Sequence, residues 1–129
     1  MKKGYLAHYC CCDSSIYKHA TIFTDSNRLA TIEPFAGETA NTTFYDGLLM
    51  VANCDFRPHL DTFRAQLQEA LSNDTQLSVA DAILQNSIYK RHCATADKEC
   101  LIYAITPIQW HSMRPNTIEN LKIELINTL

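Results

Sequence analysis

The sequence predicts a single α+β domain: a mostly antiparallel β-sandwich built from both ends of the chain, with two helices inserted between the halves. Three observations support this fold class. β-branched and aromatic residues fill short segments between polar turns near both ends of the chain. In the middle, the apolar residues recur every three or four positions, which is typical of helices. The length of 129 residues suits one domain. Residues 1–56 and 94–129 would form the two β-halves, and 57–93 the helical insert.

The composition limits the classes of partner. The chain is 47% hydrophobic and 19% charged, which is compatible with a packed core. A formal charge of -3 provides no basic surface for nucleic acid or an anionic membrane. No apolar run approaches the ~20 residues that span a bilayer, and no apolar segment of a secretory signal follows the first lysines. We therefore expect no nucleic-acid or membrane partner and a cytoplasmic location, where the six cysteines stay reduced.

The first three strands are expected at 4–12, 16–24 and 28–35. Polar turns at 13–15 and 25–27 separate them. The third segment alternates between two faces, as a half-buried strand does. Short strands joined by tight turns form an antiparallel meander.

Two more strands, 42–45 and 48–53, flank Asp46-Gly47. An Asp-Gly pair between such segments predicts a hairpin or a tight turn. Residues 100–106 form the clearest buried strand of the chain. The alternation over 121–126 predicts a last strand with one solvent-exposed face.

Two helices are expected between these groups of strands. Pro58 suits the first turn of the first helix. Its apolar stripe is made of Leu60, Phe63, Leu67, Ala70 and Leu71. The second helix would begin at Ser78, with Asp81 three residues later as in a capping box. It would end near Arg91-His92, where basic groups suit the helix C-terminus.

The stretch 43–60 carries a resemblance to a known family. A polar turn at Asp46-Gly47 is followed by the apolar run Leu48 to Ala52, then by a polar segment and a helix. This order resembles the beginning of the catalytic barrel in metal-dependent amidohydrolases. There, such a strand ends in Pro-Gly, and the first pair of metal ligands follows as His-x-His.

Counting from Gly47, the His-x-His positions correspond to Arg57, Pro58 and His59. The second histidine is present, the first is an arginine, and the Pro-Gly pair is Val51-Ala52. The resemblance therefore implies a site that has lost its chemistry.

Other segments are similar to the small β-domain of the same enzymes, which is composite and built from both chain ends. The matching pieces are 6–9, 28–35, 38–39 and 43–48, a late helix at 77–91, and a loop and strand at 96–102. The family carries a (β/α) barrel of roughly 250 residues between the two parts. Here residues 58–92 occupy its place, so the family's other metal ligands, its lysine and its catalytic Asp have no counterparts. The resemblance implies no catalysis and no cofactor, with His59 as the one remnant ligand.

Each candidate site residue has a second interpretation. His59 is either a residual metal ligand or an ordinary histidine near a helix start, and a catalytic zinc usually needs three protein ligands. Cys54, next to Asp55 and near His59, is either a thiol nucleophile or part of a strand-to-helix connection. The other four histidines lack metal-type spacing: His8, His19, His92 and His111.

The cysteines do not form a metal motif. Cys10, Cys11 and Cys12 alternate between two faces if they lie on a strand, and Cys93 and Cys100 lack Cys-x-x-Cys spacing. They are interpreted as small buried hydrophobic residues.

The helices and one loop provide candidates for protein contacts. Without the barrel, the helical stripe either covers the β-domain or faces a second chain. The candidate interface residues are Leu60, Phe63, Leu67 and Trp110. Trp110 is otherwise a loop residue that covers one end of the sandwich. A homodimer or another protein partner is expected.

The preferred function is a non-catalytic, amidohydrolase-like module that acts through protein contacts. One alternative is a small hydrolase or ligand-binding protein with a new pocket between helices and sheet. Another is a truncated gene product with no selected function. The sequence also leaves open a barrel supplied by a second polypeptide.

Overall fold

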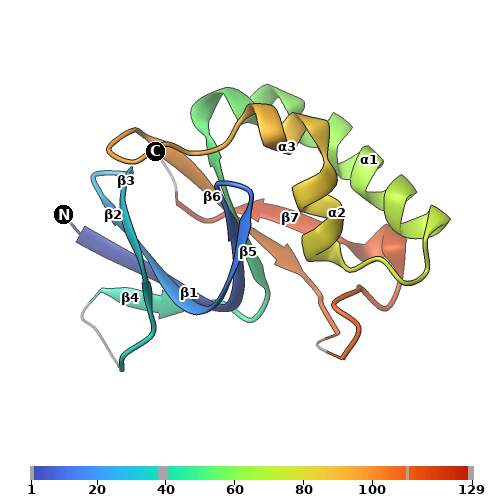
Figure 1. Cartoon of the computed structure of the whole chain (residues 1–129), viewed down its shortest axis with the longest axis horizontal. Helices are drawn as coiled ribbons and strands as arrows, with labels where there is room; N and C mark the ends of the chain where they lie inside the picture. Colours follow the sequence, from blue (N-terminus) through green and yellow to red (C-terminus); the bar gives the residue numbers. More distant parts are fainter. Residues whose placement is uncertain (1, 38–40, 110, 128–129) are drawn as a thin grey trace.

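The computed structural model describes residues 2–37, 41–109 and 111–127, which fold into one strongly curled sheet with a helical layer (Figure 1). The strands and helices appear in the order that the sequence predicts, with one α-helix and two short 3-10 helices more. In chain order they are β1 (Lys2–Cys12), β2 (Ser15–Asp25), β3 (Arg28–Pro34), β4 (Thr42–Phe44), β5 (Leu48–Asn53), the 3-10 helix η1 (Cys54–His59), α1 (Leu60–Asn73), α2 (Val79–Gln85), α3 (Ser87–Arg91), β6 (Cys100–Thr106), the 3-10 helix η2 (Ile118–Asn120) and β7 (Lys122–Leu125).

The sheet is mixed and has seven strands. Its order is β3-β2-β1-β5-β6-β7, and β4 also pairs with β1. The pairs β1/β2, β2/β3, β5/β6 and β6/β7 are antiparallel, whereas β4 and β5 run parallel to β1. The predicted α+β class, the antiparallel meander of the first three strands and the mostly antiparallel sheet are therefore confirmed.

Of the two predictions for Asp46-Gly47, the hairpin is wrong, whereas a tight turn is present, because the N–H of Gly47 donates to the carbonyl of Tyr45 at 3.0 Å. The two flanking strands do not pair with each other, because both lie along the same edge of β1. Gly4 lies opposite Thr42, and Tyr9 lies opposite Leu48, so the register slips by one residue between the two strands. At this slip, a Cβ on Gly47 would lie 2.8 Å from the carbonyl oxygen of Ile105, so only glycine fits.

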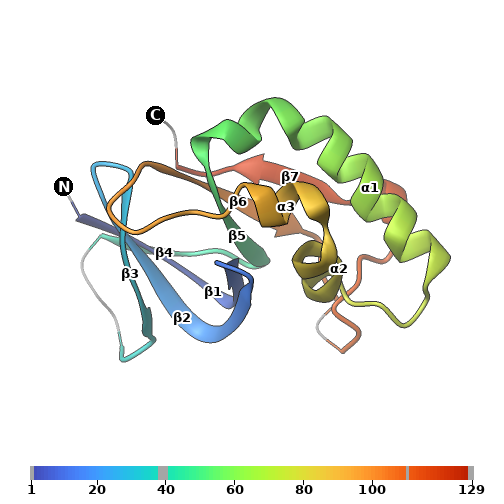
Figure 2. The same cartoon turned by 45° about the horizontal axis from the view of Figure 1, so that its top comes forward.

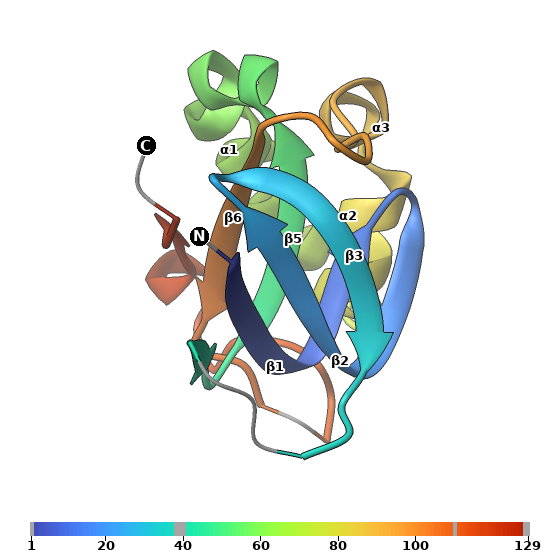
Figure 3. The same ribbon diagram turned by 90° about the vertical axis from the view of Figure 1, so that its left-hand side faces the viewer.

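A bend in the β1–β2 hairpin gives the sheet its sandwich-like shape. Ala7 and Cys10 face the same core although they are three residues apart, whereas Tyr9 faces the other core. Opposite this point, His19 on β2 has a positive φ of 49°. The bend brings β2 and β3 across one face of β5 and β6 (Figure 3).

The sheet separates two hydrophobic cores. The helices cover one face, mainly over β5, β6 and β7 (Figure 2). The core beneath them includes Leu48, Met50, Phe56, Phe63, Leu67, Ile83, Tyr89, Leu101 and Tyr103. The core enclosed by the curled hairpin includes Tyr5, Ile22, Leu29, Leu49, Val51, Cys100 and Ile102. Successive residues of β5 belong to different cores, so this strand is buried on both faces.

The predicted second helix is two helices, so the prediction of two inserted helices is wrong by one. Asn86 has an extended backbone between α2 and α3. Its side-chain oxygen accepts hydrogen bonds from the N–H groups of Ile88 at 2.8 Å and Tyr89 at 3.1 Å. Asn86 therefore caps a new helix in the middle of a continuous apolar pattern. The predicted start at Ser78 is confirmed, because its hydroxyl accepts from the N–H of Asp81 at 3.1 Å.

Across the described ranges, the structure contains no helix that combines the length and the apolar character needed to cross a bilayer.

Candidate functional site

The helical stripe that the sequence offers as an interface lies mostly inside the molecule. Phe63 is 0% exposed and Leu67 is 1% exposed, and both pack under α1 against the sheet. Leu60 is half-buried at the edge of the same core. Neither Phe63 nor Leu67 is available to a partner, so α1 covers the sheet of its own chain. The fourth candidate, Trp110, lies outside the described residues.

His59 lies exposed at the end of η1, beside His92. The two imidazole ring centroids are 4.9 Å apart. Nδ1 of His92 lies 2.8 Å from the carbonyl oxygen of Ile88, so this nitrogen carries the proton and donates it. Within residues 2–37, 41–109 and 111–127, no group of three or more His, Cys, Asp or Glu side chains is arranged to hold a metal ion. Arg57, also exposed, lies two residues before His59 and disfavours a cation there.

Cys54 opens η1 and is half-buried. Burial raises its pKa above the ordinary value, and the nearby Glu99 and Asp55 carboxylates add to this effect, although Arg57 opposes it. Because the thiolate is the nucleophilic form of cysteine, this environment disfavours attack by Cys54 at neutral pH.

The strand cysteines alternate between the two cores, as predicted. Cys11 faces the helices, whereas Cys10 and Cys12 face the hairpin core. Burial is the main cause that raises the pKa of Cys11 and of Cys12 to about 12, and that of Cys100 to about 11. These thiols are protonated near neutral pH and pack as small hydrophobic groups.

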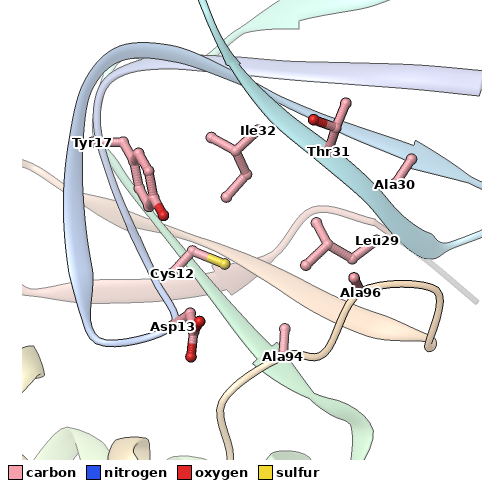
Figure 4. A pocket seen from close by; sticks show the side chains of 9 residues that line it. All are labelled: Cys12, Asp13, Tyr17, Leu29, Ala30, Thr31, Ile32, Ala94 and Ala96. Carbon is pink, nitrogen blue, oxygen red and sulfur yellow. The ribbon is translucent and has the colours of Figure 1, made fainter.

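A pocket of about 240 Å³ opens beside Cys12, on the face of the sheet opposite the helices. It therefore does not lie between helices and sheet, where a pocket was expected for the alternative function of a small hydrolase or ligand-binding protein. Figure 4 shows the side chains of Cys12, Tyr17, Leu29 and Ile32 grouped around it. The full lining is Cys12, Asp13, Tyr17, Leu29, Ala30, Thr31, Ile32, Ala94 and Ala96.

Backbone pairing with a distant loop creates this pocket. The N–H of Leu29 donates to the carbonyl of Lys98 at 2.9 Å, and the N–H of Asp97 donates to the carbonyl of Leu29 at 2.8 Å. These bonds fix the loop against the start of β3. The loop then diverges from β3, and Ala94 and Ala96 form the second wall of the pocket.

A second hollow of about 290 Å³ continues along β3. Its lining is Asp25, Ser26, Arg28, Leu29, Ala30 and Asp97. The two hollows share Leu29 and Ala30, so they follow each other along the strand, and we call them together the β3 groove. The groove is apolar near Cys12 and carries carboxylates toward its ends: Asp13 at one, Asp25 and Asp97 at the other.

A second surface feature lies on the part of the sheet that the helices leave uncovered. Phe44 is 52% exposed, and its ring centroid is 5.3 Å from that of His8. The rings of His8 and His19 meet edge to face at 5.8 Å. Phe35, 46% exposed, donates its N–H to the carbonyl of His19 at 2.7 Å. We call these four residues the aromatic face.

Sequence reasoning missed both features. The β3 groove depends on contacts between residues far apart in the sequence, such as Arg28 and Asp97, which are 69 positions apart. Local sequence patterns do not predict such contacts. For the aromatic face, the sequence signal was a phenylalanine directly after β3, Phe35, and another as the last residue of β4, Phe44.

Comparisons with protein-family models, with curated proteins and with solved structures find no match to this chain.

Proposed function

We propose that this chain is a non-catalytic module, derived from the composite β-domain of amidohydrolases, and that it acts through protein contacts, with a second copy bound at the aromatic face. The observation that carries the proposal is the exposure of Phe44, at 52%, against the ring of His8, together with that of Phe35, at 46%, whose backbone is hydrogen-bonded to His19. Contiguous apolar groups on a surface typically mark an interface. Aromatic residues are also enriched in interface cores.

The chemistry of the described residues supports a non-catalytic role. The position that resembles the first metal ligand holds Arg57, and its neighbour His59 packs against another imidazole. The thiol of Cys54, the nucleophile candidate, has a raised pKa. All six cysteines are free, and the reducing, cytoplasmic environment expected from the sequence stays a prediction.

The test is the mass in solution, measured by light scattering on a sizing column over a range of concentrations. We expect a dimer for the natural chain. Phe44→Ser should weaken the dimer at least tenfold, because burying a Phe side chain contributes about 1.5–3 kcal/mol and tenfold corresponds to about 1.4 kcal/mol.

Ile16→Ser is the matched control for this experiment. Ile16 is also a large exposed hydrophobic residue, at 38%, but it lies near the tip of the β1–β2 hairpin, outside the aromatic face. Its substitution should leave the dimer unchanged. A monomer at every concentration, or equal effects of the two substitutions, would contradict the proposal.

The alternative function, a small hydrolase or ligand-binding protein, is supported by the pocket beside Cys12 only in a changed form, because this pocket lies on the face of the sheet opposite the helices. The protonated thiol there favours binding over nucleophilic catalysis. Ligand screening by thermal shift on the natural chain tests this alternative. Stabilisation that is lost when Ala96→Trp fills the pocket would favour it.

A further inference from the structure

We infer that the β3 groove binds an extended segment of a partner protein, with one aliphatic side chain in the pocket beside Cys12 and basic residues on either side of it. Like the proposed function, this inference holds that the chain acts by binding another protein. It concerns a separate surface and a different chain as partner, so the two can fail independently.

The backbone of β3 offers a place for an added strand. β3 is the terminal strand of the sheet. The 97–99 loop pairs with its outer edge only at Arg28 and Leu29. Past Leu29, nothing in the described ranges forms a backbone hydrogen bond to this edge. Unpaired N–H and C=O groups on a terminal strand are the usual template for an incoming extended peptide.

A bulge lies at Ala30, where the pairing of β3 with the 97–99 loop ends. Thr24 lies opposite Leu29 and Phe23 lies opposite Thr31, so Ala30 has no partner residue on β2. Bulges change the direction of a strand and are frequent next to functional sites. Here the bulged residue belongs to both halves of the groove.

The pocket beside Cys12 has the size and polarity for a single aliphatic side chain. Its volume of about 240 Å³ lies below the ~300–1,000 Å³ of small-molecule and cofactor sites. Leu29, Ile32 and Ala94 form apolar walls, and the Cys12 thiol is protonated near neutral pH. A charged side chain would lose its hydration there without gaining a partner of opposite charge in the interior.

The charge of the groove favours certain residues of the partner on either side of its aliphatic side chain. Asp13 lies at one end of the groove, and Asp25 and Asp97 lie at the other. Arg28 is the cationic group in the lining, and its Nη1 donates to the main-chain carbonyl of Asp97 at 3.1 Å. The carboxylates of Asp13 and Asp97 alone outnumber the guanidinium, so lysine or arginine side chains are favoured next to the aliphatic residue. These groups are exposed, so the attraction is screened by salt.

The test is fluorescence anisotropy of the full chain with labelled peptides. The probe is Lys-Thr-Val-Thr-Lys, compared with Glu-Thr-Val-Thr-Glu and with Lys-Thr-Asp-Thr-Lys. We expect saturable binding of the first peptide, binding at least tenfold weaker for the other two, and an affinity that falls as salt rises. Equal binding of the Lys-flanked and Glu-flanked peptides, or no binding of any of them, would overturn the inference.

A pair of tryptophan substitutions locates the binding. Ala96 lines the pocket from an exposed loop, so Ala96→Trp fills the pocket while sparing the core. The adjacent Thr95 is exposed and is not part of the lining, so Thr95→Trp is the matched control. Binding should fall at least tenfold in Ala96→Trp and stay unchanged in Thr95→Trp. Unchanged binding in Ala96→Trp would exclude the pocket as the site.

The charge argument has its own variant, Asp13→Asn combined with Asp97→Asn. Both positions have positive φ, 49° and 66°, a conformation that asparagine tolerates well. The double variant should fold normally and lose most of its preference for Lys over Glu. Retention of the full preference would assign it to other charges and overturn this part of the inference.

The same samples separate the inference from the proposed dimer. Phe44→Ser should bind the Lys-flanked peptide normally even when it is monomeric. Ala96→Trp should remain dimeric. Loss of peptide binding in Phe44→Ser would show that the two surfaces are not independent.

Discussion

Arg114 caps α1, a helix that ends at Asn73, 41 residues earlier in the chain. Its Nη2 donates to the carbonyl of Leu71 at 2.7 Å. Its Nη1 donates to the carbonyls of Asp74 at 2.8 Å and Leu77 at 2.7 Å. The last carbonyls of a helix lack partners within the helix and carry partial negative charge. A guanidinium both donates hydrogen bonds to them and balances that charge. The N–H of Val79 donates to the carbonyl of Met113 at 2.8 Å, so the same loop also holds the start of α2.

Arg114→Ala should lower the free energy of unfolding by about 2–3 kcal/mol, because it leaves the partly buried carbonyls of Leu71 and Leu77 without their charged donor. Arg114→Lys should recover part of the loss. The measurement is urea unfolding followed by circular dichroism.

Arg64→Ala is the control for this prediction. Arg64 forms an exposed ion pair with Asp61 on α1 at 2.9 Å, so its removal should cost less than about 0.5 kcal/mol. Similar losses for the two arginines would mean that the cap contributes no more than a surface pair.

Asn127 continues the hydrogen bonding of β6 beyond the end of β7. Its Oδ1 accepts from the N–H of Ile102 at 2.6 Å, and its Nδ2 donates to the carbonyl of Cys100 at 2.8 Å. Because the side chain is 2% exposed, Asn127→Ala should cost about 2–3 kcal/mol of unfolding free energy. Asn116→Ala, at an exposed position, should be nearly neutral. A small loss at position 127 would contradict a structural role for this side chain.

Gly47 leaves no room for a side chain. An added Cβ would lie 2.6 Å from Cγ2 of Thr106 as well as 2.8 Å from the Ile105 carbonyl oxygen. Gly47→Ala should therefore cost about 1–3 kcal/mol, the usual range for overpacking. Combining it with Thr106→Ser removes the methyl contact but not the backbone contact, so rescue should be partial. Full rescue in thermal unfolding would assign the whole cost to the methyl group.

The buried thiols predict a loss of stability in alkali. Burial raises the pKa of Cys11 and Cys12 from 9.0 to about 12, and that of Cys100 to about 11. Above pH 9 the unfolded chain loses these protons while the folded chain keeps them, so ionisation favours unfolding. The stabilisation is complete below about pH 9 and is lost progressively up to about pH 12. Each thiol contributes a slope of at most about 1.4 kcal/mol per pH unit.

Cys11→Ala tests this prediction by comparison of slopes. The unfolding free energy of the variant should fall less steeply between pH 9 and pH 11 than that of the natural chain. Parallel slopes would contradict a buried, protonated thiol at this position. The variant must be compared with the natural chain because the pKa of the buried tyrosine Tyr5 is also raised, so Tyr5 adds its own loss of stability in alkali.

Local patterns predicted the strands well. A strand that is buried on one face alternates apolar and polar residues, and a strand that is buried on both faces is a continuous apolar run. Residues 48–53 and 100–106 are observed as predicted. Pairing partners were harder: Asp46-Gly47 carries a hairpin signal, yet both flanking strands pair with β1. The break at Asn86 was hidden because apolar spacing continues through it.

The candidate site was less predictable than the strands. An apolar stripe such as that of Phe63 and Leu67 has the same spacing whether it covers its own sheet or meets another chain. The sequence therefore could not choose between the two. The pocket beside Cys12 joins the end of β1 to residues 94–96, and short-range patterns do not contain that contact.

The burial of β5 on both faces has a consequence for the newly made chain. During synthesis, Leu48 to Ala52 emerge long before β6, which pairs with this strand along its whole length. Until β6 and the helices are made, this apolar, uncharged segment has few neighbours to cover it. Such segments are the ones that aggregate from partly folded chains. Chaperone dependence and poor recovery from the ribosome should therefore increase in variants that delay or weaken the pairing of β5 with β6.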